Sequence, residues 1–553
     1  MSKQIFYDND ARSRLLAGAE QLYNAVKTTM GPKGRNVIIN KSFGAPTITH
    51  DGVTVAKGFD LSEDGEENYG HKTGAELIKQ AASKMNDVAG DGTTTVTVLT
   101  YHILKEANQL ISAGHNPMQL RKGLEKASSS ALKRLQSLRE DIGTDKKKVA
   151  QIATISAGDE SIGNLIADVM DQVGKDGVVT VEEGQSLQLE SDVVEGFTFD
   201  KGFISPYMVT DTSRMEAVYD KPSILITDKK ISSVKEILPI IEKLATAGKK
   251  NLVIIGEDVD GEALGTLVLN KLKGVFNTVA IKAPAFGDRR IEVLEDIAIL
   301  TGGTLITDKQ GYSLEAVEIE HLGSARRVIV NKDETTLIEG SGDLVEIKNR
   351  IAQIKSQANI ASSEYDKEEY LKRGASLQGK VAVIKVGGAT ETEIEEKKFR
   401  VDDAVHAVKA ALDEGIVPGG GVTLIDVAEH IQEVESDSDT IKAGFNLLKT
   451  TLRQPFRIIL DNAGLNADEW LPKILEQKDI EQGIDVSQSE NMKLVNMKKV
   501  GIIDPVRVVR EAIQNAVSIA GTSATMGALI VDIPDKNAPA DTPVGGGMPG
   551  MGM

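Results

Sequence analysis

The sequence predicts a multidomain protein of mixed α+β and α/β class, in which an α/β domain is inserted into a helical one. First, 553 residues exceed the size of a single ordinary hydrophobic core. Second, short Val/Ile-rich runs alternate with helical segments from about Gly174 onward. Third, apolar residues recur at helical spacing on both sides of this region. The order is therefore helical, mixed, helical, and the sequence leaves open whether the two helical parts meet.

The N-terminal region predicts helices that end at glycine-containing turns. Apolar residues at helical spacing predict helices over residues 8–29, 75–89 and 94–113. Between the first two lies a predicted hairpin, with strands at 36–40 and 47–49 and a turn at 43–46.

The central region predicts buried strands separated by helices, which favours partly parallel pairing. The runs most typical of strands are residues 178–181, 223–227, 252–255, 279–282 and 327–330. A charged helical stretch at 344–375, a buried strand at 381–386 and a helical region at 402–531 follow. The closing segment TPVGGGMPGMGM is typical of a flexible tail.

The composition argues against several classes of protein. The absence of cysteine excludes disulfide frameworks, thiol catalysis and cysteine-ligated zinc, and it fits a cytoplasmic location. A net charge of −18 argues against binding to nucleic acid or to an anionic membrane surface. No window approaches the ~20 consecutive apolar residues of a membrane helix. The N-terminus lacks the pattern of a signal or transit peptide. The seven histidines show no metal-ligand spacing, which argues against a histidine metal site.

The segment AGDGTTT, from Ala89 to Thr95, is the most informative motif. Two glycines allow close approach of the backbone, and the threonines open a helix whose N-terminus favours anions. Asp91 would repel phosphate by itself but suits a Mg²⁺ ion that bridges carboxylate and phosphate. The alternative is an ordinary capped turn between two helices.

Two further glycine-rich segments can each be interpreted either as a ligand-binding loop or as an ordinary loop. The segment TMGPKGRN, residues 29–36, combines glycines, a proline and two cations, and by itself it also fits a helix end with solvated charges. Gly415 and the segment PGGG, residues 418–421, would let the backbone approach a base or a sugar. Taken singly, each is only a loop.

Together these motifs resemble the bacterial GroEL-type group I chaperonin family. The resemblance runs from residue 2 to 553 and is carried by TMGPKGRN, Thr49-His50-Asp51-Gly52, AGDGTTT, Asp402-Asp403, PGGG, Gly501-Ile502-Ile503-Asp504-Pro505 and the Gly/Met tail. It implies an ATP-dependent chaperonin that captures non-native polypeptides under a GroES-type heptameric co-chaperonin lid. It also implies two stacked seven-membered rings. The implied domains are equatorial (1–137 and 414–532), intermediate (138–194 and 381–413) and apical (195–380), with a tail at 533–553.

The resemblance also assigns roles to individual residues. Asp403 corresponds to the carboxylate that orients the attacking water, with help from Asp51; the alternative for the pair Asp402-Asp403 is an acidic first helical turn. Asp91 corresponds to the Mg²⁺ ligand, and the backbone of Thr29 and His50 to a K⁺ site. The residues implied to contact ATP are Thr29, Met30, Gly31, Pro32, Asp91, Gly92, Thr93, Thr94, Thr95, Gly420, Asp485, Val486, Ser487 and Asp504.

The implied apical domain carries the predicted polypeptide-binding residues. Two stretches, 234–241 and 264–272, each show an apolar stripe at helical spacing, which on its own is more typical of core. The positions carried over by resemblance are Phe203, Tyr207, Met208, Leu238, Ile241, Leu264, Val268 and Leu269.

Several positions depart from the commonest pattern of that family. They are His50 in place of a lysine, Lys380 in place of a glycine, Asp485-Val486-Ser487, and a longer segment at 62–72. None of these departures removes an implied phosphate ligand or Asp403. Two alternatives to the ATP-dependent chaperonin stay open. One is a chaperonin-like scaffold with impaired ATP cycling, and the other is a small-molecule kinase or ligase that uses the same loops.

Overall fold

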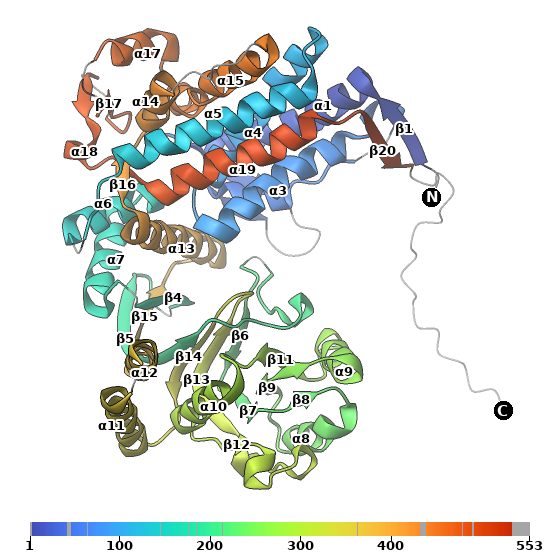
Figure 1. Ribbon diagram of the computed structural model, residues 1–553, viewed down its shortest axis with the longest axis vertical. Coiled ribbons are helices and arrows are strands. Elements are labelled where there is room, and N and C mark those ends of the chain that lie inside the picture. Colours follow the sequence, from blue (N-terminus) through green and yellow to red (C-terminus); the bar gives the residue numbers. More distant parts are fainter. Residues whose placement is uncertain are drawn as a thin grey trace, which may run out of the picture. The chain divides into compact units, whose positions relative to one another are not determined.

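The structure is a computed structural model, which describes residues 3–533 except 41–45, 63–64, 432–437, 489–491 and the single positions 144, 176, 185, 213, 362, 478 and 480. The chain packs into two compact units (Figure 1). Unit 1 comprises residues 1–167 and 388–553, and unit 2 comprises residues 168–387. Each of the two segments predicted as intermediate is divided between the units, and the six-segment domain assignment stays a prediction.

Unit 1 is a body of helices contributed by both ends of the chain (Figure 1). Its N-terminal part contains α1 (Asp8–Val26), the 3-10 turn η1 (Lys27–Thr29), α2 (Gly52–Gly58), η2 (Glu66–Asn68), α3 (His71–Ala89), α4 (Thr93–Ser112), α5 (Pro117–Leu138) and α6 (Lys146–Ala157). Helix α7 (Glu160–Val173) spans the boundary between the units. The C-terminal part contains α13 (Glu391–Glu414), α14 (Val422–His430), α15 (Asp439–Thr451), α16 (Gln454–Asn462), α17 (Ala467–Leu475), α18 (Met497–Val500) and α19 (Val506–Ala524).

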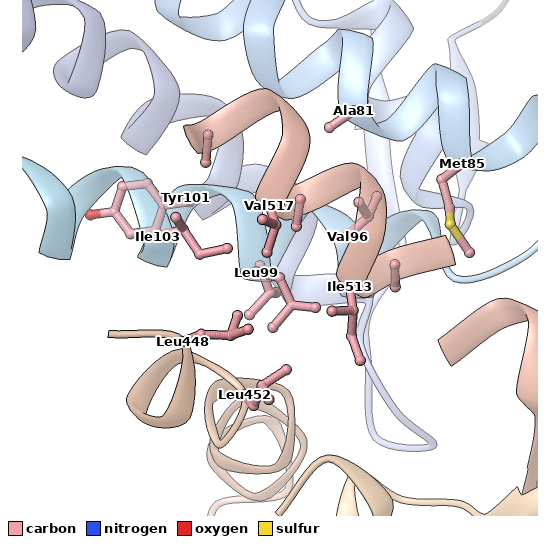
Figure 2. Packing of buried hydrophobic residues seen from close by; sticks show 14 of the residues in the cluster. Ala81, Met85, Val96, Leu99, Tyr101, Ile103, Leu448, Leu452, Ile513 and Val517 are labelled. Carbon is pink, nitrogen blue, oxygen red and sulfur yellow. The ribbon is translucent and has the colours of Figure 1, made fainter. Parts of the chain in front are cut away.

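The core of unit 1 forms where α19 packs against α3, α4 and α5. Figure 2 shows Leu99 of α4 beside Ile513 and Val517 of α19, with Leu448 of α15 next to them. All four side chains are buried. Buried residues lie around most of the circumference of α4, so it has partners on several sides, which are α1 and α3 from the N-terminal part and α15 and α19 from the C-terminal part. Segments from opposite ends of the chain thus share one core.

The expectation of an all-helical body needs one correction. Unit 1 also carries short two-stranded sheets. Two of them involve the N-terminal part, where β1 (Lys3–Tyr7) pairs with β20 (Ala528–Asp532) and β2 (Val37–Ile39) pairs with β3 (Thr47–Thr49). Two lie in the C-terminal part, where β16 (Ile416–Pro418) pairs with β19 (Ile503–Pro505) and β17 (Gln482–Ile484) pairs with β18 (Leu494–Asn496). Strands of three to five residues have too few alternating side chains to stand out in a sequence. For the same reason the predicted helical region 402–531 is wrong in part, because four of these strands interrupt it and a fifth, β20, forms its end.

Unit 2 is built on a large mixed sheet. The strand order is β11-β9-β7-β13-β14-β5-β15-β4, and β12 and β6 pair at its side. Strands β7, β9 and β11 run parallel, as the alternation of strands and helices predicted. The strands are β4 (Val178–Glu183), β5 (Glu190–Phe199), β6 (Ala217–Asp220), β7 (Ser223–Thr227), β9 (Asn251–Gly256), β11 (Asn277–Lys282), β12 (Leu305–Ile306), β13 (Gly323–Val330), β14 (Thr335–Gly340) and β15 (Lys380–Val386), with β8 (Lys230–Ile231) and β10 (Asp258–Val259) as a separate pair.

The helices of unit 2 are α8 (Val234–Thr246), α9 (Gly261–Leu272), α10 (Gly287–Thr301), α11 (Leu344–Ile360) and α12 (Glu364–Leu377), with 3-10 turns η3 (Pro206–Met208), η4 (Asp308–Gln310), η5 (Leu314–Ala316) and η6 (Ile319–His321). Of these, α9, α10 and α12 pack on the sheet, whereas α11 packs on α10 and α12 (Figure 1). The charged stretch predicted at 344–375 is thus two helices.

Three predicted features concern residues that the structure leaves out. The tail after residue 533 and most of the turn at 43–46 lie outside the described residues, as do two positions of the longer segment 62–72. Among the helices in the described ranges, none is long and apolar enough to cross a membrane.

Candidate functional site

The segment AGDGTTT forms the turn between α3 and α4, as its glycines predicted. Gly90 caps the end of α3 with a φ of +67°, and Gly92 precedes α4 with a φ of +79°. Both angles lie in the left-handed region that favours glycine. The first turn of α4 begins at Thr93, so its free backbone N–H groups lie directly after Asp91.

The Asp91 side chain is held from two sides. One carboxylate oxygen accepts a hydrogen bond from the backbone N–H of Gly92, and the other accepts one of 3.1 Å from the Ser156 hydroxyl of α6. Removal from water raises the pKa of Asp91, the two hydrogen bonds lower it, and the neighbouring Asp51 raises it. Ser156 was missed by sequence reasoning, because nothing near residue 156 indicates that α6 reaches this turn.

Asp51 joins the start of α2 to the start of α4. Its carboxylate caps α2 by accepting hydrogen bonds from the N–H groups of Val53 (3.1 Å) and Thr54 (2.8 Å), and it lies 3.4 Å from the Thr93 hydroxyl. The approach requires glycine at position 52, because a Cβ there would lie 2.5 Å from the Thr94 hydroxyl oxygen. The two helix N-termini therefore converge on one carboxylate.

Asp403 lies well inside α13, which begins at Glu391. The alternative interpretation of Asp402-Asp403 as an acidic first helical turn is therefore wrong. Burial raises the pKa of Asp403 well above its ordinary value, and the charges of Asp51, Asp91 and, least, Asp402 raise it further. The structure thus brings together three carboxylates that the sequence places far apart.

The loop after α1 lies against the same helix start. The hydroxyls of Thr29 and Thr94 are 3.0 Å apart, and Gly31 has a φ of +81°. Met30 is buried in the core of unit 1, whereas Pro32 is exposed. The side-chain amide of Asn462 in α16 donates to the carbonyl oxygens of Lys27 and Met30, at 2.9 Å each. Asn462 was also missed, since its role depends on where α16 packs.

The PGGG segment and Asp504 are neighbours across the β16–β19 pair. Val417 pairs with Asp504 in register, and a Cβ at Gly419 would lie 2.8 Å from the Asp504 carboxylate. Gly420 follows with a φ of +68°. Burial raises the pKa of Asp504 to about 7, and the charge of Asp91 adds to this effect.

The raised pKa of Asp504 predicts a stability that depends on pH. From about pH 4 to about pH 7 the folded protein retains a proton that the unfolded chain releases, so stability falls as pH rises through this window. Asp504→Asn should remove this dependence. The free energy of unfolding of Asp504→Asn minus that of wild type should therefore be larger at pH 8 than at pH 5, by on the order of 2 kcal/mol. Urea midpoints of the nucleotide-free proteins measure the effect, and parallel pH profiles would contradict it.

Residues 485–487 form a turn of their own. The Asp485 carboxylate accepts hydrogen bonds from the backbone N–H of Ser487 (3.0 Å) and from the Gln488 side chain (2.9 Å). The Val486 side chain is buried in a small apolar core that also contains Met497. Any contact that Val486 makes with a ligand must therefore come from its backbone.

His50 precedes Asp51 and lies near α13. Burial lowers the pKa of its imidazole, and the positive charge of Arg400 lowers it further, although Asp51 acts in the opposite direction. The histidine is therefore neutral at pH 7, unlike a lysine at this position.

The carboxylates of this site fit a metal that is completed by another ligand. Within the described residues, no three His, Asp or Glu side chains are placed to hold an ion by themselves. Asp51, Asp91 and Asp403 nevertheless interact as like charges that are largely removed from water, an arrangement that a divalent cation would relieve. Mg²⁺ prefers such an arrangement, with one or two carboxylates and phosphate oxygens.

The predicted polypeptide-binding residues lie around α8, α9 and η3 in unit 2. Tyr207, Leu238 and Leu269 expose 65%, 42% and 52% of their surface. Partly buried apolar side chains continue the surface, namely Phe203, Ile241, Leu264 and Val268. Lys271 of α9 ties the two parts together by donating to the carbonyl oxygens of Tyr207 and Val209. We call these exposed and partly buried residues the apolar face.

Met208 is the exception in this group. Its side chain is fully buried, and its sulfur accepts a hydrogen bond from the backbone N–H of Ala280 at 3.2 Å. The prediction that Met208 offers its side chain to a polypeptide is therefore wrong for this conformation. Its neighbour Tyr207 points outward because successive residues of the η3 turn face different sides.

Comparison of the sequence with known protein families adds an independent result. Residues 22–533 match the TCP-1/cpn60 chaperonin family. The match includes the turn between α3 and α4, Asp403, the PGGG segment and the apolar face. Since it spans nearly the whole sequence, the chain belongs to the TCP-1/cpn60 chaperonin family and is a chaperonin.

Proposed function

We propose that the protein is an ATP-dependent chaperonin of the bacterial GroEL-type group I, which hydrolyses ATP to drive the capture and folding of non-native polypeptides. The observation that carries this proposal is the convergence of Asp51, Asp91 and Asp403 on the glycine-flanked start of α4. The match of residues 22–533 to the TCP-1/cpn60 chaperonin family favours this function over that of a small-molecule kinase or ligase.

In the proposed reaction each residue of the site has a separate task. The N–H groups at the start of α4 and the hydroxyls of Thr29 and Thr94 bind phosphate oxygens. Asp403 accepts a hydrogen bond from the water that attacks the terminal phosphorus, and Asp51 supports it from the start of α2. The backbone at Gly420 and the carboxylate of Asp504 would recognise the ribose and base, since the PGGG segment and Asp504 are neighbours across the β16–β19 pair.

Two cations belong to this proposal. Asp91 would hold Mg²⁺, which when bound neutralises charge on the phosphate oxygens. The carbonyl groups of Thr29 and His50 would hold K⁺. Ser156 contributes by fixing the orientation of the Asp91 carboxylate.

The apolar face supplies the proposed binding surface for polypeptides. Membership of the family implies binding of non-native polypeptides and assembly into rings. We propose further that the rings are seven-membered and stacked in pairs, that a GroES-type heptameric lid competes for the apolar face, and that the protein acts in the cytoplasm. The exposed side chains of Tyr207, Leu238 and Leu269 can bind many different apolar segments, because hydrophobic contacts are not directional.

Asn462 provides a prediction about the nucleotide loop. Asn462→Ala should raise the Kd for ATP about tenfold, because the carbonyl oxygens of Lys27 and Met30 lose their donor and the loop loosens. Asn446→Ala, on an exposed position of α15, serves as the control and should leave the Kd unchanged. Isothermal titration calorimetry gives both values, and equal affinities in the two variants would contradict the assignment.

The function as a whole is tested by combining light scattering with a refolding assay. We expect a particle of about fourteen subunits that hydrolyses ATP and raises the yield of an aggregation-prone protein only when ATP and a co-chaperonin are present. A ring that binds polypeptide but does not hydrolyse ATP would indicate a scaffold with impaired cycling. A monomer that phosphorylates a metabolite would overturn the proposal.

A further inference from the structure

His406 lies one turn after Asp403 on α13 and rests on the backbone of Gly90 at the end of α3. A Cβ at Gly90 would lie 2.3 Å from both the Cβ and the Cγ of His406 and 2.9 Å from its Cδ2. Protein atoms do not approach so closely without displacement. Gly90 also has a left-handed φ of +67°. Position 90 therefore requires glycine for two separate reasons, its backbone conformation and its contact with His406.

One face of α13 carries three side chains that meet three parts of the site. The charge of Arg400 lowers the pKa of His50, and Asp403 interacts as a like charge with Asp51 and Asp91. His406 lies against the backbone of Gly90. Their spacing of three residues places them along the same side of the helix. Arg400 and Asp403 act through charge over a distance, whereas His406 makes a hard contact with the main chain. Only a hard contact defines how closely a helix can approach its neighbour.

The contact bears directly on the position of Asp403. Gly90 is bonded to its own helix, because its N–H donates to the carbonyl oxygen of Asn86 at 2.9 Å, and it is followed at once by Asp91. An imidazole that rests on Gly90 therefore sets α13 relative to Asp91. Misplacing a reacting group by about 1 Å costs up to about 10²-fold in rate.

We propose that the contact between His406 and Gly90 sets the depth at which α13 lies on the turn between α3 and α4, and that His406 is thereby a positioning residue for Asp403. This inference rests on the proposed hydrolysis of ATP. We assign this role to the part of His406 nearest Gly90, its Cβ and Cγ, although the residue as a whole is exposed.

Substitution of His406 gives the first test, on the full-length assembled protein. His406→Ala should lower kcat for ATP hydrolysis about tenfold while the Kd for ATP stays within about threefold of wild type, because it removes Cγ and Cδ2, two of the three atoms nearest Gly90, and leaves the phosphate loops intact. His406→Phe keeps a flat ring over Gly90 and should retain kcat within about threefold. Equal losses of kcat in both variants, or a change confined to the Kd, would overturn the proposal.

An exchange across the contact gives the second test. Gly90→Ala should lower kcat further than His406→Ala does, since its methyl group displaces α13. Adding His406→Gly to Gly90→Ala should recover at least about threefold of this loss, because it removes the His406 atoms that the methyl group would strike. Gly158→Ala is the matched control. Gly158 also ends a helix, with a φ of +66°, but has no atom within 4 Å of a Cβ. It carries the same backbone strain without the contact and should keep kcat within about threefold.

The wild-type protein separates failure of this inference from failure of the proposed function. If the assembled wild type does not hydrolyse ATP, both are overturned. If it hydrolyses ATP and the double variant Gly90→Ala/His406→Gly is no faster than Gly90→Ala, only the positioning role of His406 is overturned.

Discussion

Asp403→Ala should bind ATP with nearly normal affinity and hydrolyse it at least about 10²-fold more slowly than wild type. The carboxylate lies among Asp51 and Asp91 on α13, where it can orient the attacking water but is not needed to hold the phosphates. A loss confined to kcat is the signature of an interaction made in the transition state. Single-turnover hydrolysis together with equilibrium binding of ATP measures the two effects separately.

The adjacent aspartate offers a matched control for this experiment. Asp402→Ala removes the same charge from the same helix, but Asp402 has the smallest influence of the three neighbouring carboxylates on the pKa of Asp403. Adjacent helical residues face different directions, so Asp402→Ala should keep kcat within about threefold of wild type. Near-normal turnover in Asp403→Ala, or equal losses in the two variants, would contradict the assignment.

Leu238→Glu should abolish capture of unfolded polypeptide and leave ATP hydrolysis intact. Leu238 exposes 42% of its surface on the apolar face, between side chains that can contact an apolar segment. Any polypeptide bound there would have to desolvate the new carboxylate, at a cost of several kcal/mol. Binding should therefore fall at least about tenfold, which a fluorescence assay with a denatured protein can measure.

The control for Leu238→Glu lies in the same unit. Leu371 of α12 exposes 51% of its surface and is not part of the apolar face. Leu371→Glu introduces the same charge at a similar exposure, so its capture of polypeptide should match wild type. Loss of binding in both variants would indicate a general effect of charge, and retention in both would remove the apolar face from the proposed mechanism.

The sequence predicts best those features that local pattern determines. Helices α3 and α4 and the glycine turn between them follow from apolar spacing and from the conformational needs of Gly90 and Gly92. Strands such as β7 and β9 follow from continuous apolar runs. In each case the residues that specify the element lie within it.

The remaining features depend on partners that are remote in the sequence. The β1–β20 pair joins the two ends of the described chain, and neither strand stands out by itself. Ser156, Asn462 and His406 owe their roles to the packing of α6, α16 and α13, which no local pattern reveals. Met208 failed as a predicted contact because an apolar residue on a short turn is equally suited to core and to surface.

The shared core of unit 1 has a consequence for the biosynthesis of the protein. Residues 168–387 of unit 2 are contiguous, so its sheet can form as soon as they leave the ribosome. Helix α4 is made earlier, but the α19 residues that cover Leu99 are made after unit 2. Nascent chains can cover α4 with α1 and α3, but the side of α4 that faces α19 stays uncovered until α19 has been made, and exposed apolar surface of this kind favours aggregation.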